Sequence, residues 1–216
     1  MDDHERDETP ATAELVAEFV NTRQLPGSFD GGRQVREELS TPSALARWFQ
    51  KRGLLAAGAT VSEAELRWAI EVREALRELL EANNGLPARS AGVETLNRAA
   101  RGAHVQLTFR PDGRAALVAY ASGVDAALGR LLAAAAASQA EGGWERLKAC
   151  RNEDCLWAFY DHSKNRSATW CCTNCGNLMK ARAYRRRRAA RHKEAAHDIA
   201  TNQTDLPGSR DPTAHS

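Results

Sequence analysis

The chain has 216 residues, of which 43% are hydrophobic and 27% are charged, and its 30 Lys and Arg residues nearly balance 28 Asp and Glu residues. This composition is typical of a folded globular protein and excludes a chain that is disordered throughout. No apolar run reaches the roughly 18 residues of a membrane span, and the polar, acidic start is the opposite of a secretory signal, so we expect a cytoplasmic protein.

The first 140 residues predict a mainly helical domain. Thr41 followed by Pro42 indicates a helix start, because Pro at the first helical position loses no hydrogen bond. Ser62 followed by Glu65 has the form of a capping box, and Ser122 stands where it would cap a last helix. Apolar residues at helical spacing predict helices over residues 11–24, 42–53, 62–85, 90–101 and 122–140.

Residues 104–120 have a different period. Val105, Leu107 and Phe109 alternate with polar residues, and a Pro-Asp-Gly turn follows them. This pattern predicts one small β-hairpin within the helical domain.

Nothing in this helical part indicates catalysis. Its histidines, His4 and His104, are isolated, and no Ser or Cys stands in a nucleophile motif. Glutamates of the 62–85 helix alternate with Arg67, Arg73 and Arg77, which we interpret as solvated, salt-bridged helix faces.

The chain changes character after Gly142-Gly143. Residues 1–143 carry 16 basic and 20 acidic side chains, net −4, whereas residues 144–216 carry 14 and 8, net +6. All five cysteines lie in the second part, which indicates two modules with different roles. We therefore expect a disordered start at 1–10, a helical domain at 11–143, a cysteine module with a basic helix at 144–200, and a disordered tail at 201–216.

The cysteines form two close pairs separated by about 15 residues, which is the ligand pattern of tetrahedral zinc. A metal ion would join two loops that are too small to form a core of their own. An odd number of cysteines and the absence of a secretory signal disfavour disulfides, whereas an iron–sulfur cluster takes the same four thiolates. His162 is a further candidate ligand, which we place at the surface. The candidate ligands are Cys150, Cys155, Cys171, Cys172 and Cys175.

Five cysteines compete for four ligand positions. Cys172 forms C-x2-C with Cys175, whereas Cys171 forms C-x3-C. Spacing favours Cys172, because C-x2-C followed by a glycine, here Gly176, is a common chelating turn. We expect a short β-like segment at 156–160 and the second pair at a helix N-terminus, whose dipole favours thiolates. The predicted fold class is thus mainly α, with a small zinc-bound knuckle or ribbon module that ends in a basic helix.

The last helix is strongly basic. Residues 177–196 contain no helix breaker, and residues 176–193 hold eight Lys or Arg and no acid. One interpretation is a solvated helix, and the one we favour is contact with nucleic-acid phosphates, which gives salt-dependent affinity with little sequence information. The candidate contact residues are Asn177, Lys180, Arg182, Arg185, Arg186, Arg187, Arg188 and Arg191.

Aromatic residues accompany both features. Trp157, Phe159, Trp170 and Tyr184 have rings of the kind that stack on bases. Such residues more often form the small core around a metal, and we expect that role for all four.

The cysteine pairs and the residues between them follow the pattern of a known family. The matching positions are Cys150, Cys155, Trp157, Phe159, Asp161, Ser163, Asn165, Ser167, Trp170, Cys171, Cys175, Gly176, Asn177 and Lys180. This segment resembles the CGNR-type zinc finger at the C-terminus of bacterial proteins with an ABATE domain, described as stress-induced transcription regulators. Residues 15–23, LVAEFVNTR, are also similar to the opening of that family. The resemblance covers the chain apart from its tails and implies Zn²⁺ as the cofactor and DNA as a partner.

Three departures from the family pattern concern function. Leu178 replaces the arginine of the family name, and Ala168 and Thr169 stand where the family commonly has two arginines. The second cysteine pair is also one residue shorter if Cys171 is the family's ligand, which leaves Cys172 as a candidate. The first two departures remove cations that would meet DNA.

We expect a zinc-binding, DNA-binding transcription regulator. Its helical domain would sense a small-molecule effector, in a pocket bordered by the loop at 25–40 and the hairpin, or form a homodimer. The alternative is a zinc-stabilised module that binds RNA or an acidic protein without sequence-specific DNA binding. The basic helix favours the first function and the missing arginines favour the second. An enzyme is not expected, because four cysteine ligands leave no open position on the metal.

Overall fold

The computed structural model describes residues 9–27 and 34–204. The chain divides into two units, Met1–Cys175 and Gly176–Ser216. Within the described residues, no helix has both the length and the apolar character needed to cross a membrane. The expected disordered ends fall largely on residues 1–8 and 205–216, which lie outside the described part of the chain.

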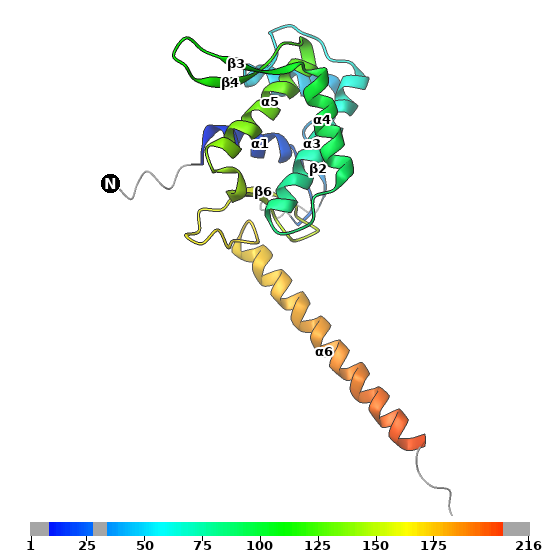
Figure 1. The fold of residues 1–216 in the computed structure, drawn as a ribbon. Coiled ribbons are helices and arrows are strands. Elements are labelled where there is room, and N and C mark those ends of the chain that lie inside the picture. Colours follow the sequence, from blue (N-terminus) through cyan, green and yellow to red (C-terminus); the bar gives the residue numbers. More distant parts are fainter. Residues whose placement is uncertain (1–8, 28–33, 205–216) are drawn as a thin grey trace, which may run out of the picture. The chain divides into compact units, whose positions relative to one another are not determined.

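Five helices form most of the first unit, as predicted (Figure 1). Two of their starts have the expected caps. The Thr41 hydroxyl accepts a hydrogen bond from the main-chain N–H of Ala44 at 3.2 Å, and Ser62 and Glu65 form a complete capping box. Ser122 precedes its helix but makes no side-chain cap, so that expectation was wrong. The helices are α1 (Ala11–Val20), α2 (Pro42–Lys51), α3 (Glu63–Asn83), α4 (Ser90–Gly102) and α5 (Gly123–Ala140).

Three short antiparallel strand pairs accompany these helices. The predicted hairpin is confirmed as β3 (Val105–Phe109) with β4 (Ala115–Ala119). The segment expected to be β-like contains β6 (Ala158–Tyr160), which pairs with β5 (Leu147–Ala149). The pair β1 (Arg23–Gln24) and β2 (Arg36–Glu37) was not predicted. Helix α1 therefore ends at Val20 and not at residue 24 as predicted, because residues 23 and 24 are extended in β1.

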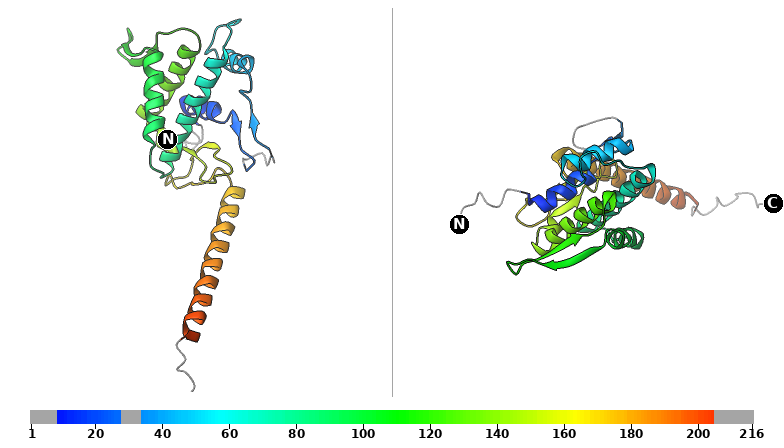
Figure 2. Two further views of the ribbon diagram at one scale, coloured as in Figure 1. Left: turned by 90° about the vertical axis from the view of Figure 1, so that its right-hand side faces the viewer. Right: turned by 90° about the horizontal axis from the view of Figure 1, so that it is seen from above.

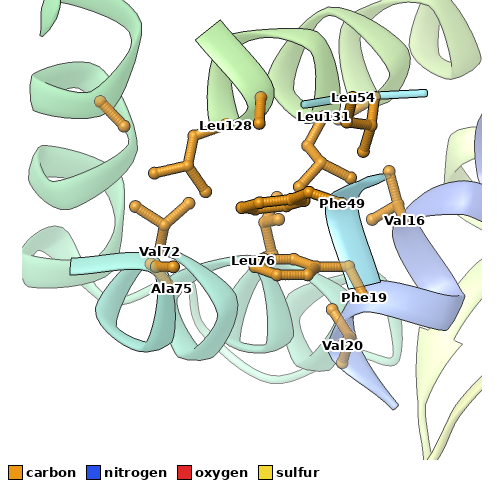
Figure 3. Close-up of a cluster of buried hydrophobic side chains, with 14 of the residues drawn as sticks. Val16, Phe19, Val20, Phe49, Leu54, Val72, Ala75, Leu76, Leu128 and Leu131 are labelled. Carbon is orange, nitrogen blue, oxygen red and sulfur yellow. The ribbon is translucent and has the colours of Figure 1, made fainter. Parts of the chain in front are cut away.

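The core of the first unit lies between α1, α2, α3 and α5. Phe19 and Phe49 stack with ring centroids 6.0 Å apart, and Leu76 and Leu128 pack around them (Figure 3). Leu147 and Ala158, from β5 and β6, belong to the same buried cluster. The strands that carry the cysteine segment therefore begin inside the core of the helical domain, and Gly142-Gly143 does not separate two cores.

The helices pack closely enough to hold the hairpin and the cysteine segment in place. Helix α4 packs along α3 (Figure 2). Gly129 of α5 lies directly against the hairpin, since a Cβ at this position would come within 2.7 Å of the Ala119 Cβ. The described elements of the first unit thus form one packed body.

The described residues of the second unit all belong to helix α6 (Thr173–Thr204). The expected continuous basic helix is confirmed, and it extends further at both ends than predicted. Residues 201–204 are helical, so the start of the expected disordered tail was placed too early. At about 1.5 Å per residue, a helix of this length extends for roughly 48 Å.

Candidate metal centre

Four cysteine side chains come together in the first unit. The sulfur atoms of this cysteine cluster lie within 4.8 Å of one another. Individual Sγ–Sγ distances are 3.6 Å between Cys155 and Cys171 and 3.8 Å between Cys171 and Cys175. A tetrahedral zinc ion with Zn–S bonds of about 2.3 Å holds its sulfur ligands about 3.8 Å apart. The cluster, which consists of Cys150, Cys155, Cys171 and Cys175, therefore fits a zinc ion.

The structure places Cys171, and not Cys172, in this group. The preference for Cys172 from spacing is thus not reproduced by the geometry. Helix α6 begins at Thr173, so Cys171 lies in the segment just before the helix and Cys175 lies in its first turn. The two sulfur atoms meet at the start of the helix, 3.8 Å apart. Cys172 is half-buried and packs beside the cluster.

A tight turn positions the first cysteine pair. The main-chain carbonyl of Asn152 accepts hydrogen bonds from the N–H groups of Cys155 at 2.8 Å and Leu156 at 3.1 Å. Leu156 has φ = 50°, a left-handed conformation that non-glycine residues seldom adopt. We expected such a turn at Gly176, but that residue lies within α6. The left-handed turn therefore follows the first pair and is made by a leucine.

Without a metal ion, hydrogen bonds among the thiols favour one thiolate, at Cys150, over the others. The pKa of Cys150 is lowered to about 2, because the side chains of Cys155 and Cys171 donate hydrogen bonds to its sulfur. The pKa values of Cys155 and Cys171 are raised by the same contacts. Asn152 is buried, and its Nδ2 donates a hydrogen bond to the Cys175 Sγ at 3.7 Å. An amide donor at this position stabilises a thiolate ligand.

Aromatic side chains surround the sulfur atoms. Trp157, Phe159 and Trp170 pack against the cluster, which confirms the role expected for them. Tyr184 is 60% exposed, so its assignment to this core was wrong. His162 is exposed, as expected, and its ring contacts the Thr9 hydroxyl.

Asparagine side chains of the helical domain hold the cysteine segment. Asn21, at the end of α1, bonds both main-chain groups of Ala158, at 2.9 Å to the carbonyl and 2.8 Å from the N–H. Asn83 donates to the carbonyls of Trp144 and Leu147, and Asn84 donates to those of Ala149 and Thr169. From the sequence, Asn83 and Asn84 were expected only to lie at the end of the predicted helix over residues 62–85. The available signal in the sequence was the presence of two consecutive asparagines at a helix end, because their side-chain amides can donate hydrogen bonds to the main chain of a neighbouring segment.

Two arginines of α3 are buried, which corrects their assignment to a solvated face. Arg73 is 1% exposed and forms a two-bonded ion pair with Glu37, at 2.7 and 2.8 Å. Arg77 is 4% exposed and donates to the carbonyls of Val20 and Leu156. Both also pair with Glu74. Arg77 thus connects α3, the end of α1 and the turn after Cys155.

A buried ion pair organises the loop between the two cysteine pairs. Lys148 Nζ lies 2.7 Å from the Asp161 carboxylate and also donates to the carbonyls of Arg166 and Ala168. Asp161 accepts further hydrogen bonds from the main-chain N–H groups of Ser163 and Ala168. Asp161 and Ser163, which belong to the family pattern, therefore have a structural role in this loop.

This ion pair predicts a dependence of stability on pH. Burial raises the pKa of Asp161, but hydrogen bonds from Lys148 and Ser163 outweigh it and lower the pKa below its ordinary value. The contribution to stability is therefore complete above about pH 4 and is lost as pH falls through the lower, folded-state pKa. Asp161→Asn leaves Lys148 buried without its counter-charge and is expected to cost about 3 kcal/mol at pH 7.

Urea unfolding at pH 7 and pH 3 measures this effect. The variant should lose less stability between the two pH values than the wild-type protein. Glu145→Gln is the matched control, because Glu145 pairs with Arg166 at an exposed position of the same loop and exposed pairs contribute less than about 1 kcal/mol. Equal effects of the two substitutions would contradict the role assigned to Asp161.

The candidate nucleic-acid contacts all lie on α6. Asn177, Lys180 and Arg191 are exposed, and so are the four consecutive arginines at 185–188. Arg182 is half-buried. Leu178, which replaces the family arginine, is 37% exposed.

Two family models match the chain. The model of ABATE, described as "Putative stress-induced transcription regulator", matches residues 13–142, which is more than half of the chain. The model of the CGNR zinc finger matches residues 146–188, which include the cysteine cluster and the four consecutive arginines. None of the curated proteins matches the chain.

Proposed function

The chain belongs to the ABATE family and carries a CGNR zinc finger, and from this we propose that it is a zinc-dependent, DNA-binding transcription regulator of the cytoplasm. The observation that carries the proposal is the composition of α6, which contains Cys175 and then eight cations without an acid over residues 176–193. Zinc would fix the start of the helix, and the helix would meet DNA.

Cys150, Cys155, Cys171 and Cys175 are the proposed zinc ligands, and Cys172 is the spare thiol. Zinc bound by four thiolates supplies folding energy and has no open position for water or substrate. Its role in this chain is therefore structural, and we propose no enzymatic activity.

The distribution of arginines suits a helix in a groove. Successive residues of a helix are about 100° apart, so the arginines at 185–188 point in four directions around α6. A helix in the major groove has a phosphate backbone on either side, and arginines on several faces reach both. Asn177 and Arg182 are the proposed base contacts. The helical domain would sense an effector or form a homodimer.

A second function has an observation in its favour. Leu178, Ala168 and Thr169 stand where the family commonly has arginines. Loss of these cations favours binding of α6 to RNA or to an acidic protein surface, without selection of a DNA sequence.

The salt dependence of duplex binding tests the arginines directly. Each phosphate contact contributes about −0.9 to the slope of log affinity against log salt concentration. Replacement of the four arginines at 185–188 by alanine is expected to reduce the slope by about 2 to 4. Their replacement by lysine is the matched control and should keep most of the slope, because phosphate attraction depends on charge.

Fluorescence anisotropy with one labelled duplex between 50 and 300 mM salt measures both variants. An alanine variant with the wild-type slope would contradict phosphate contact by this part of α6.

A further inference from the structure

A cavity of about 320 Å³ lies in the first unit where α1, α2 and β6 meet. This volume is within the range of pockets that hold small molecules. Its walls combine aromatic rings and carboxylates, from Trp48, Trp157, Tyr160, Glu14, Glu18 and Glu38. Of the loop expected at 25–40, Glu38 is the described residue that lines the cavity, and no residue of the β3–β4 hairpin does.

The charges around the cavity do not cancel. Arg52 contributes a positive charge to the cavity wall, but it already has partners. Its Nε lies 2.7 Å from a carboxylate oxygen of Glu18, and its guanidinium stacks 3.8 Å above the Trp48 ring. Among the described residues, no cation pairs with Glu14 or Glu38. Aromatic faces and unpaired carboxylates both attract a positive charge on an organic molecule. We propose that this cavity binds an organic cation, that is, an amine or quaternary ammonium with an apolar body.

The walls are held in place without a ligand. The main-chain N–H of Glu38 donates to the carbonyl of Thr22 at 2.9 Å, which fixes this carboxylate-bearing residue beside the end of α1. Asn21 bonds both main-chain groups of Ala158, which fixes β6 on the opposite side. A preformed site loses little free energy to ordering when it binds.

The cavity shares side chains with the cysteine cluster. Trp157 and Phe159 line the cavity and also pack against the cluster. The carbonyl of Trp157 accepts a hydrogen bond from the N–H of Cys150 at 2.9 Å. A cation that packs against these rings restricts side chains that also pack on the sulfur atoms. The cavity is therefore the effector site of the proposed regulator, an assignment that rests on the proposed ligand-sensing function. By thermodynamic linkage, zinc and the organic cation alter each other's affinity by the same factor.

Calorimetric titration of the zinc-loaded full-length protein with benzyltrimethylammonium tests the site. Benzyl alcohol, which has the same ring without the charge, is expected to bind at least about tenfold more weakly, because cation–π attraction and two carboxylates are lost. The double variant Glu14→Gln with Glu38→Gln should bind benzyltrimethylammonium about five- to tenfold more weakly than the wild-type protein. Glu63→Gln, at an exposed position outside the cavity, is the matched control and should leave the affinity unchanged.

Two outcomes would overturn the site. One is equal affinity for the charged and the neutral probe, and the other is an unchanged affinity in the double variant. A second measurement tests the coupling by competing zinc away with a chromophoric chelator, with and without saturating benzyltrimethylammonium. The zinc affinity should change by about fivefold or more, and an unchanged value would refute the coupling. No DNA is present in either experiment, so a failure of DNA binding leaves both results intact.

Discussion

Cys171→Ser is expected to lose bound zinc, whereas Cys172→Ser keeps it. The sulfur of Cys171 lies 3.6 Å from that of Cys155 and 3.8 Å from that of Cys175, and Cys172 is not a member of the group. Removal of one of the four thiolates should lower the affinity for zinc by more than about 100-fold, which is the upper end of the loss seen when a hydrogen-bond partner of a ligand is removed. Elemental analysis of the purified proteins gives the metal content. Competition with a chelator gives the affinity.

Cys150→Ser and Cys155→Ser serve as positive controls for zinc loss. Full zinc content in Cys171→Ser together with its loss in Cys172→Ser would contradict the proposed ligand set. Zinc loss should loosen the cysteine segment but spare the helical domain, because Leu147, Ala149 and Ala158 remain packed in its core. A cooperative thermal transition should therefore persist in the chelated protein.

Arg73→Ala is expected to destabilise the protein by about 3 to 5 kcal/mol, which is the usual cost of breaking a buried ion pair. Arg73 is 1% exposed, forms two bonds to Glu37 and also donates to the buried Thr22 hydroxyl. Its removal leaves the Glu37 carboxylate and Thr22 without their donor and opens a cavity beneath β2. Chemical denaturation at pH 7 measures the change in the free energy of unfolding.

Arg101→Ala is the matched control for this substitution. Arg101 is an exposed arginine that pairs with an exposed Glu94, and such pairs contribute less than about 1 kcal/mol. A similar cost for both replacements would show that Arg73 behaves as a surface residue, which would contradict its assigned role.

Local signals in the sequence predicted most of the helical fold. Thr41 with Pro42, and Ser62 with Glu65, are helix starts that depend on residues within one turn, and both are found in the structure. The β3–β4 hairpin follows from alternation and a turn, which are equally local. Most residues of the cysteine cluster were also evident, because two close cysteine pairs about 15 residues apart have the spacing of a tetrahedral metal site.

The sequence could not predict features that depend on distant partners. Arg73 looked like a surface residue because its partner Glu37 is 36 residues away. The bonds of Asn84 reach Ala149 and Thr169, which no local pattern connects to a helix end. The choice between Cys171 and Cys172 depends on where α6 begins, and helix boundaries are the least predictable feature of a helix.

Selection from a random pool of duplex DNA with the zinc-loaded full-length protein, at low and at physiological salt, tests the central claim most directly. A specific regulator should enrich one sequence family at physiological salt, and chelation of zinc should abolish that enrichment. Binding that disappears as salt rises and enriches no sequence would reflect phosphate attraction alone. That result would contradict sequence-specific regulation and favour an RNA or acidic protein partner for α6.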